Sequence, residues 1–477
     1  MMAGRWATKA PRVGWYGDDF TGASDTLATW AERGFRAVLL TRIPEAARLA
    51  ALGPLDAVGL AGATRSLDPA AMARELDPAG RFFAGLGVDL LHYKCCSTFD
   101  SAPQVGSIGA AVAALRPHFP HPTLPIVGGQ PNLGRYCLFG QLFATAGAGG
   151  EAYRIDRHPT MSRHPVTPMD EADLRLHLAR QGLGDLGLVD YPTYALPPAE
   201  ATARVAALAA THPGLLFDVS REQDLAIIGE WLWTWAERAP LVAVGASSVA
   251  RALAAAWPAT RAGTPAVPMS GPSMPSRPMP GPSMPGPSAA AGPVFVLVGS
   301  LSPVTRAQMA QATRYETVAL DVARLIAEDA YRDAQAVRIA EGLAAGRPML
   351  AATGLPGAEA VEAGAGAAGA GAGAAKAGAD PQPRFGTLQV AEATARLAAA
   401  VLSRIRPART CIAGGDTSSL AIQALGLWGL SHIATLGPGA ALCRTHADRA
   451  AMDGLEIMLK GGQMGQPTLF DDLVVGL

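Results

Sequence analysis

Lysine is scarce in this chain of 477 residues, whose 39 basic side chains are almost all arginines. The lysines are Lys9, Lys94, Lys376 and Lys460. An ammonium group is a compact point charge and a guanidinium a broad planar fork, so a retained lysine marks a position that arginine fills poorly. Lys94 and Lys460 each adjoin a Gly- or Ser-rich segment, which makes them candidates for ligand contacts. Chance placement is the alternative.

The chain also lacks a large net charge, the cysteine spacing of a metal or redox motif, and long apolar runs. Its formal net charge of -1 provides no field that would attract nucleic acid or an anionic membrane. The five cysteines show no CxxC spacing, and no charged, apolar leader precedes the first expected strand. Every apolar stretch falls short of the roughly 20 residues of a membrane-spanning helix. We therefore predict a cytoplasmic protein with no nucleic-acid or membrane partner.

Short β-like runs alternate with helical stretches along the chain. Alternation of this kind predicts an α/β fold, with mostly parallel sheets covered by helices. A hydrophobic content of 49% and a charged content of 17% suffice for two domain cores. The clearest strands are expected at 37–41, 57–60, 90–93, 125–127, 241–244, 294–298 and 410–413.

Two segments interrupt this alternation. Residues 261–293 repeat Met-Pro, Gly-Pro and Ser-Pro units, which predict an extended linker between two lobes. Residues 357–380 are almost entirely Gly and Ala, with too few large apolar groups to form a core, and predict a surface insertion. The predicted domains are 11–260 and 294–477, the second of which carries the insertion.

The first lobe opens with the segment GDDFTGASD, Gly17 to Asp25, between an apolar run and an amphipathic helix. A parallel strand that ends here would leave its last side chains and the free N–H groups of the helix facing one crevice. Asp18 and Asp19 would then lie where a ligand binds. A capped strand-to-helix turn with solvated aspartates explains the segment equally well.

Polar groups follow two further strands of this lobe. Arg65, between Thr64 and Ser66, can hold a carboxylate through two parallel hydrogen bonds. Lys94 and Ser97 belong to the segment KCCSTFDSAPQVGSIG, whose hydroxyl groups suit a polyol.

The segment HPVTPMDEADL, residues 164–174, fits a helix start. Thr167 is expected to cap a helix that begins at Pro168. His164, before a proline, is expected to be a structural hydrogen-bonding group rather than a catalyst.

The second lobe carries glycine clusters after its strands. In GGDTSSLAIQALG, Gly414 and Gly415 let the backbone approach a phosphate, and Asp416, Thr417 or Ser418 would cap the following helix. Further clusters lie at 299–305, 436–440 and 459–465. Each cluster alone is more typical of a turn, but together they favour a phosphate-bearing ligand. Neither GxxxxGK[ST] nor GxGxxG follows these strands, so a P-loop or standard dinucleotide fold is not supported.

The order of these motifs resembles the four-carbon acid sugar kinase family. The matching motifs are GDDFTGASD, the TR pair at 64–65, a lysine followed by Ser-Thr, GR within PNLGRYCLFG, HPVTPM, GSLSPVTRAQ, AGGDTS and LKGGQMG. The resemblance covers nearly the whole chain apart from the linker and the Gly/Ala tract. It implies an ATP-dependent kinase that phosphorylates a terminal hydroxyl of threonate, erythronate or a 3-oxo-tetronate.

The resemblance also implies where the two substrates bind. The sugar acid would meet the first lobe at Asp18, Asp19, Arg65, Lys94 and Ser97, with Asp18 or Asp19 as the catalytic base. ATP would meet the second lobe at Ser300, Gly414, Gly415, Asp416, Thr417, Gly461 and Gly462. Mg²⁺ would bridge the phosphates, and no side chain is assigned as its ligand, although Asp416 would lie near.

One segment departs from the family pattern. Where relatives read close to DSTLRGN after the lysine, this chain reads CCSTFDSAP, so that Asp100 and Ser101 stand in place of an arginine and an asparagine. The change resembles the 3-oxo-isoapionate kinase branch, whose substrate is a branched, oxidised sugar acid. It bears on the choice of substrate, not on the reaction.

Two other functional classes remain open from the sequence. A nicotinamide-dependent oxidoreductase would share the α/β pattern, but no dinucleotide fingerprint follows a predicted strand of the second lobe. A non-catalytic sugar-acid sensor would need only the first lobe, whereas the second lobe has a full set of glycine turns. The oligomeric state is not predicted.

Overall fold

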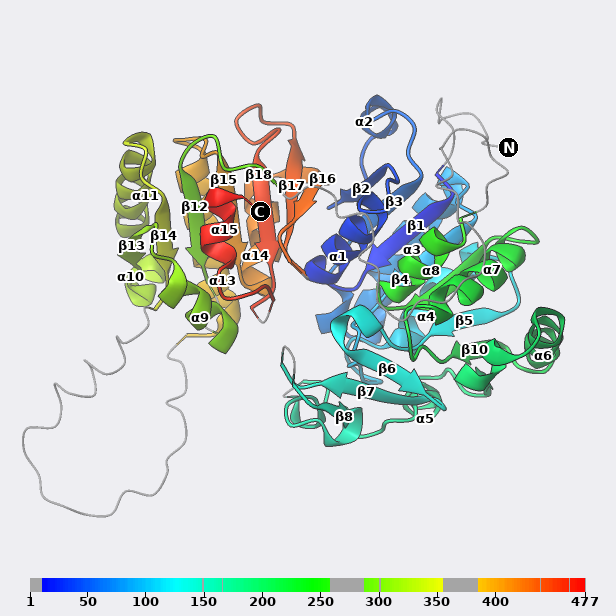
Figure 1. The fold of residues 1–477 in the computed structure, drawn as a ribbon. Helices are drawn as coiled ribbons and strands as arrows, with labels where there is room; N and C mark the ends of the chain where they lie inside the picture. The colour runs from blue at the N-terminus through cyan, green and yellow to red at the C-terminus, as the bar shows by residue number, and fades with distance from the viewer. Residues whose placement is uncertain are drawn as a thin grey trace, which may run out of the picture. The chain divides into compact units, whose positions relative to one another are not determined.

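The computed structural model describes residues 11–147, 150–164, 166–257, 287–299, 302–354, 385–437, 439–462 and 464–476 (Figure 1). They form two compact units, one of residues up to 257 and one of residues from 287 on. The predicted α/β fold with two lobes is confirmed. Most of the predicted linker 261–293 and all of the predicted insertion 357–380 lie outside the described residues.

The sheet of the first unit is wholly parallel in the part of the chain that is described. Its strand order is β2-β3-β1-β4-β11-β5-β10-β9. The five strands predicted by range in this unit and the strand expected before Gly17 are confirmed, whereas β9 and β10 were not predicted. The bounds are β1 Val13–Gly17, β2 Ala37–Leu40, β3 Ala57–Ala61, β4 Leu90–Lys94, β5 Leu124–Val127, β9 Leu186–Val189, β10 Gly214–Phe217 and β11 Leu241–Gly245.

Helices cover both faces of this sheet. Crossovers between parallel strands are right-handed. A helix that connects to a strand on one side of its starting strand therefore lies on one face of the sheet, and a helix that connects to the other side lies on the opposite face. Helix α1 leads from β1 towards β2, and α3 leads from β3 towards β4, the opposite way. Accordingly α8 packs against α1 and α7, and α4 packs against α3. The bounds are α1 Phe20–Ala31, α2 Ala46–Ala51, α3 Pro69–Leu86, α4 Ile108–Leu115, α5 Leu174–Ala179, α6 Pro198–Thr211, α7 Asp224–Ala236 and α8 Ser248–Ala255.

The first unit also contains a small antiparallel sheet that the sequence did not predict. Its order is β6-β7-β8, with bounds β6 Arg135–Leu138, β7 Gln141–Thr145 and β8 Ala152–Arg154. Figure 1 shows it beside α5, below the parallel sheet.

The predicted helix start at Pro168 is wrong. Helix α5 begins at Leu174, and the side chain of Asp173 caps it by accepting from Arg175 N. Thr167 N instead donates to His164 Nδ1 at 3.1 Å, so His164 is a structural hydrogen-bonding group as predicted.

The sheet of the second unit is parallel except at one edge. Its order is β13-β14-β12-β15-β18-β17-β16, in which β17 runs antiparallel to both neighbours. The predicted strands 294–298 and 410–413 are confirmed as β12 and β15. The bounds are β12 Val294–Val298, β13 Glu316–Ala319, β14 Met349–Ala352, β15 Arg409–Ala413, β16 Leu427–Thr435, β17 Ala441–Ala447 and β18 Glu456–Lys460.

Two helix layers enclose this second sheet. Helices α9 and α15 pack together over a core that includes Val296, Cys411, Met458 and Phe470. Helix α13 packs against α11 and α14. In the described residues, no helix combines the length and the apolar character needed to cross a membrane. The bounds are α9 Pro303–Gln311, α10 Val322–Ala327, α11 Asp329–Ala344, α13 Thr387–Leu402, α14 Gly415–Leu425 and α15 Leu469–Val475.

Glycines in the central strands make room for aromatic rings around β1. Trp15 and Phe83 are fully buried. A Cβ atom on Gly59 of β3 would lie 2.0 Å from the Trp15 ring, and one on Gly14 would lie 2.5 Å from the Phe83 ring. Both rings therefore fill space that a larger residue on the strand would occupy.

Gly59→Ala should destabilise the protein, because its methyl group overlaps a buried ring that cannot move freely. Overpacking of this kind costs about 1–3 kcal/mol. Gly85→Ala is the matched control, since Gly85 lies in α3 and a Cβ there has no neighbour within 4 Å. Alanine is favoured over glycine in a helix by about 1 kcal/mol, so the control should be neutral or stabilising. Urea denaturation of both variants measures the difference, and equal stabilities would contradict this account of Gly59.

Candidate functional site

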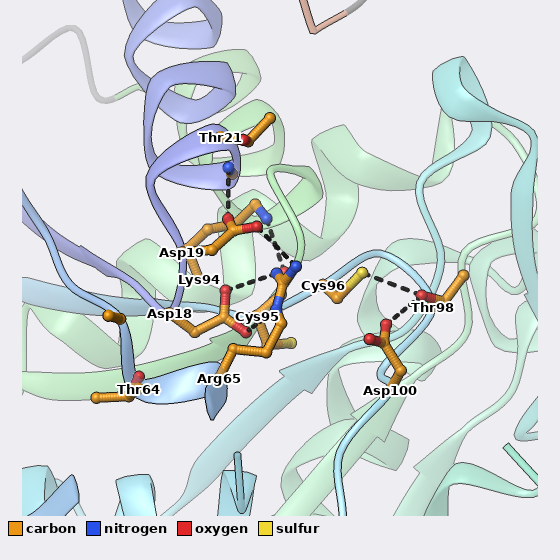
Figure 2. A network of polar contacts seen from close by, with 12 residues as sticks. Asp18, Asp19, Thr21, Thr64, Arg65, Lys94, Cys95, Cys96, Thr98 and Asp100 are labelled. Atoms are coloured by element: carbon orange, nitrogen blue, oxygen red, sulfur yellow. Dashed lines mark hydrogen bonds and ion pairs between the residues drawn. The ribbon is translucent and has the colours of Figure 1, made fainter. Parts of the chain in front are cut away.

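The carboxyl end of β1 places two carboxylates against one guanidinium (Figure 2). Asp18 and Asp19 follow β1 directly, and Arg65 lies in a 3₁₀ turn after the neighbouring strand β3. Arg65 Nε and Nη2 donate to Asp18 Oδ2 and Oδ1 at 3.1 and 2.8 Å. Arg65 Nη1 lies 2.6 Å from Asp19 Oδ2. All three nitrogens of the Arg65 guanidinium thus face carboxylates of the chain itself. This guanidinium was predicted to bind the carboxylate of a substrate.

Asp19 also caps helix α1. Its Oδ1 accepts a hydrogen bond from Gly22 N at 2.6 Å. The side chain of Asp19 is 30% exposed, against 7% for Asp18. The capped-turn interpretation of GDDFTGASD is therefore correct for Asp19, but both aspartates are engaged with Arg65 rather than simply solvated.

The pKa shifts in this group follow from burial and from the close charges. Burial raises the pKa of the Asp18 carboxyl, Arg65 opposes that shift, and Asp19 adds to it. Burial alone would lower the pKa of Arg65, but Asp18 and Asp19 raise it well above its usual value. A permanently charged guanidinium thus lies beside a carboxyl that takes up a proton more readily than an exposed aspartate.

Lys94 lies on the other flank of β1. It is the last residue of β4, which pairs with β1, and it is 4% exposed. Its Nζ donates to Cys95 O at 2.7 Å. A Cβ on Gly22 would lie 2.6 Å from this Nζ and 2.7 Å from Asp19 Oδ1. The ammonium group therefore lies beside the first turn of α1, near the capping carboxylate.

A tight turn follows Lys94 and holds a second acidic group. Phe99 N donates to Cys96 O at 3.0 Å, and Phe99 has a φ of 54°. Ser97, predicted to meet the substrate, is half-buried on this turn. The Thr98 hydroxyl donates to Asp100 Oδ1, and Asp100 is buried. The sequence placed Asp100 on this turn, in place of a residue that the family has beside the substrate, but its contact with Thr98 was not predicted.

Three neighbouring strands of the second unit end in glycines at one edge. Gly299 follows β12, Gly414 follows β15 and Gly461 follows β18. A Cβ on Gly299 would lie 2.2 Å from Thr417 Oγ1, and Gly414 has a φ of 130°. Both positions therefore require glycine.

Helix α14 begins at the centre of this edge. Its first residues, Gly415 and Asp416, are exposed, while Thr417 is buried. The free N–H groups of an exposed first turn suit an anion. No side chain caps this helix within the described residues, so its first N–H groups keep that capacity.

A buried lysine supports the same edge. Lys460 is the last residue of β18 and is fully buried. Its Nζ donates to Thr305 Oγ1 at 3.2 Å and to Gly461 O at 3.1 Å. The hydroxyls of Ser302 and Thr305 both donate to Gly462 O. Among the described residues no carboxylate is paired with Lys460, and its charge meets neutral oxygens and the ring of Phe470, whose centroid lies 5.9 Å from Nζ.

Comparison with known proteins agrees with this division of the chain. The sugar-binding N-terminal domain model matches residues 13–253, and the nucleotide-binding C-terminal domain model matches residues 295–470. The chain is 38% identical to the 3-oxo-isoapionate kinase of Paraburkholderia graminis, over 96% of this chain and 93% of that one. The chain belongs to the four-carbon acid sugar kinase family.

Further relatives agree with this assignment. The chain is 32% identical to the 3-oxo-tetronate kinase of Methylobacterium radiotolerans, over 96% of this chain and 97% of that one. A solved structure from Salmonella typhimurium LT2 that is not named as a kinase shares the fold, with a TM-score of 0.72 and 26% identity over 96% of this chain and 98% of that one. The protein is therefore an ATP-dependent sugar-acid kinase.

The predicted site residues of this kinase gather in two places. The residues predicted for the sugar acid lie at the carboxyl edge of the first sheet or on the turn that follows it. Of those predicted for ATP, Ser300 lies outside the described residues, and the others share the carboxyl edge of the second sheet. Exposed N–H groups, glycines and a buried ammonium group without a carboxylate partner fit a polyphosphate.

Burial of Lys460 should make the stability of the kinase depend on pH. Burial lowers the pKa of Lys460 to about 8, so above that pH the unfolded chain binds a proton that the folded chain has lost. The free energy of unfolding should then rise with pH until the usual pKa of lysine is reached, by at most about 1.4 kcal/mol per pH unit. Lys460→Met removes this contribution.

Urea denaturation at pH 8.0 and 9.5, without nucleotide, measures the effect. We expect the free energy of unfolding of the wild type to gain about 1–2 kcal/mol over that interval relative to Lys460→Met. Cys411 of β15 would raise the pKa of Lys460 only as a thiolate, and burial raises the pKa of Cys411 to about 12, so this thiol stays neutral over the interval. The same pH dependence in both proteins would show that Lys460 is not desolvated.

Proposed function

We propose that this kinase transfers the γ-phosphoryl group of ATP to a terminal hydroxyl of 3-oxo-isoapionate. The observation that carries the choice is the 38% identity, over almost the whole of both chains, to a kinase named for that substrate. The altered segment CCSTFDSAP beside the acidic pair supports it. A 3-oxo-tetronate is the second candidate, because relatives named for that substrate reach 32% identity.

The sugar acid is proposed to bind at Asp18, Asp19, Arg65, Lys94 and Ser97. Asp19 is the more exposed carboxylate of the pair, so we assign it the role of accepting the proton of the attacking hydroxyl. Asp18 binds Arg65 through two hydrogen bonds and fixes the guanidinium. Lys94 supplies a compact charge for the substrate carboxylate, and Ser97 a hydroxyl for its polyol part.

The transfer itself needs little covalent chemistry from the protein. The hydroxyl oxygen bonds to the γ-phosphorus, the bond from phosphorus to the ADP oxygen breaks, and the hydroxyl proton passes to the carboxylate. Positioning and charge neutralisation supply most of the acceleration in such reactions. The acidic group therefore serves the acceptor hydroxyl, and the glycine edge of the second unit serves the phosphates.

ATP is proposed to bind at Ser300, Gly414, Gly415, Asp416, Thr417, Gly461 and Gly462. The backbone N–H groups at the start of α14 would hold phosphate oxygens. Mg²⁺ would bind mainly to those oxygens, with exposed Asp416 in the first turn of α14 near it.

Several coarser features accompany this proposal. We place the enzyme in the cytoplasm, which agrees with five cysteines that are all free thiols. The proposed domains are 11–260 and 294–477, and the family matches fall inside them. Neither the oxidoreductase nor the sensor alternative has support from the named relatives.

The test of substrate choice is an ATP-to-ADP coupled assay with Mg²⁺ on purified protein. The panel contains 3-oxo-isoapionate, 3-oxo-tetronates, threonate and erythronate, and the readout is kcat/KM. We expect the branched acid to be preferred by at least tenfold, since one missing group in a site costs about 1–3 kcal/mol. Preference for an unbranched acid would overturn the choice of substrate. If none of the acids is phosphorylated, none of them is the acceptor and the proposal fails for the whole panel.

Asp19→Asn should lower kcat more than Asp18→Asn does. Removing a general base costs about 10²–10⁴-fold in rate, whereas Asp18 acts by holding Arg65 in place. Both replacements are isosteric, and unchanged circular dichroism and ATP affinity would show that each variant is folded. Single-turnover rates at saturating substrate measure the chemical step. A greater loss in Asp18→Asn would exchange the two roles, and wild-type rates in both would refute the base assignment.

A further inference from the structure

We infer that Asp100 is a specificity-determining residue, which accepts a hydrogen bond from the branch hydroxyl of the sugar acid that an unbranched four-carbon acid lacks. This inference rests on the proposed function, since it assumes that a branched acid is the acceptor. It concerns the segment 95–101, which Figure 2 shows next to the Arg65 group.

The structure distinguishes Asp100 from its neighbour Ser101, which the sequence pattern alone could not do. Ser101 Oγ lies 2.9 Å from His177 Nε2 and accepts from Gln181 Nε2 at 2.8 Å. It also donates to Phe99 O at 2.9 Å. The hydrogen-bonding capacity of Ser101 is therefore used inside the protein, and only Asp100 keeps capacity for a ligand.

Asp100 is buried, and its carboxylate has two neutral hydrogen-bond partners within the described residues. Oδ1 accepts from the Thr98 hydroxyl, and the Cys96 thiol also hydrogen-bonds to this carboxylate. Asp100 forms no ion pair in this part of the chain, although two guanidinium groups lie near it: burial lowers the pKa of Arg135 and Asp100 opposes that shift, and Asp100 adds to the raised pKa of Arg65. The two oxygens of a carboxylate accept about four hydrogen bonds, so Asp100 keeps capacity for a donor from a ligand.

The orientation of this carboxylate is fixed by a short relay of hydrogen bonds. The Thr98 hydroxyl gives its one hydrogen to Asp100, and the Cys96 thiol, whose Sγ lies 3.0 Å from Thr98 Oγ1, is the donor to this group and also hydrogen-bonds to Asp100. Burial raises the pKa of the Cys96 thiol to about 11, and Asp100 adds to that shift. The thiol therefore keeps the proton that this donation needs.

An ionised carboxylate only accepts hydrogen bonds, which restricts what it can bind. It repels the carboxylate of a sugar acid and gains nothing from a keto oxygen. A hydroxyl is the group of a branched 3-oxo acid that can donate to it. The Arg65 group is close by, so a substrate held there can present a branch hydroxyl to Asp100 while its terminal hydroxyl faces Asp19.

Asp100→Asn is the main test, because the amide keeps the shape and removes the acceptor charge. We expect kcat/KM for 3-oxo-isoapionate to fall about 10- to 100-fold, the range for a lost hydrogen bond to a charged group. The value for a 3-oxo-tetronate should change less than threefold, because that acid has no branch hydroxyl to lose. Thr98→Val, which releases the carboxylate, should give the same selectivity change at about 3- to 10-fold.

The matched control is Asp170→Asn. Asp170 lies in the same unit, is 67% exposed and pairs with Arg180, so neither kcat/KM value should move. ATP affinity and melting temperature report whether each variant is folded. If Asp100→Asn does not fold, the ratio of kcat/KM values for the two acids is measured on Thr98→Val instead.

The outcomes separate this inference from the proposed function. If the wild type does not phosphorylate the branched acid, or has a higher kcat/KM for an unbranched one, both the proposed function and this inference are overturned. If the wild type prefers the branched acid but the Asp100 and Thr98 variants keep the same ratio of kcat/KM between the branched and the unbranched acid, only the inference is overturned. Equal losses on both acids would also overturn it, because Asp100 would then act on a group that both substrates share.

Discussion

Parallel strand pairing is the constraint on which both sites depend. Because β1 lies between β3 and β4, the residues that follow these three strands meet at one edge of the sheet, however far apart they are in the sequence. Asp18, Arg65 and Lys94 come together in this way. The neighbours β12, β15 and β18 do the same for the glycines of the second unit. In each unit the core sets the register, and the register assembles the polar group.

The two units use lysine in the same manner. Lys94 and Lys460 are each the last residue of a strand, are buried, and donate to the carbonyl oxygen of the residue that follows. A compact ammonium group fits below a backbone turn, where a planar guanidinium would need more room and more acceptors. The scarcity of lysine in this arginine-rich chain was thus a useful signal, because it marked two buried cations whose surroundings have little space.

Sequence patterns predicted the parallel sheets well, since alternating apolar runs and helices leave few other folds. They failed where the local signal was weak or ambiguous. The small sheet of β6, β7 and β8 has short, half-exposed strands, and only β7 alternates between buried and partly buried residues. Helix α5 begins at Leu174 with Asp173 as its cap, rather than at Pro168 with Thr167 as its cap, because two aspartates that could cap a helix follow the proline and tertiary contacts decide between them.

The candidate site was predicted as a set of residues but not as a set of contacts. Spacing indicated that Asp18, Asp19 and Arg65 face one crevice, yet it could not show that the arginine is bound by both aspartates. Nor could it separate Asp100 from Ser101, because that depends on a left-handed turn at Phe99 and on partners from a distant helix. Which side chain remains free for a ligand is a property of packing, and a linear pattern does not contain it.

The pairing of Arg65 with two aspartates has a consequence for how the sugar acid is recognised. Asp18, Asp19, Arg65 and Lys94 together carry two negative and two positive charges, so the group is electrically balanced before any substrate arrives. An anionic substrate therefore meets little long-range attraction at this edge. Selectivity instead comes from fixed donors and acceptors at short range. The free-energy cost of desolvating these charges falls on folding rather than on substrate binding.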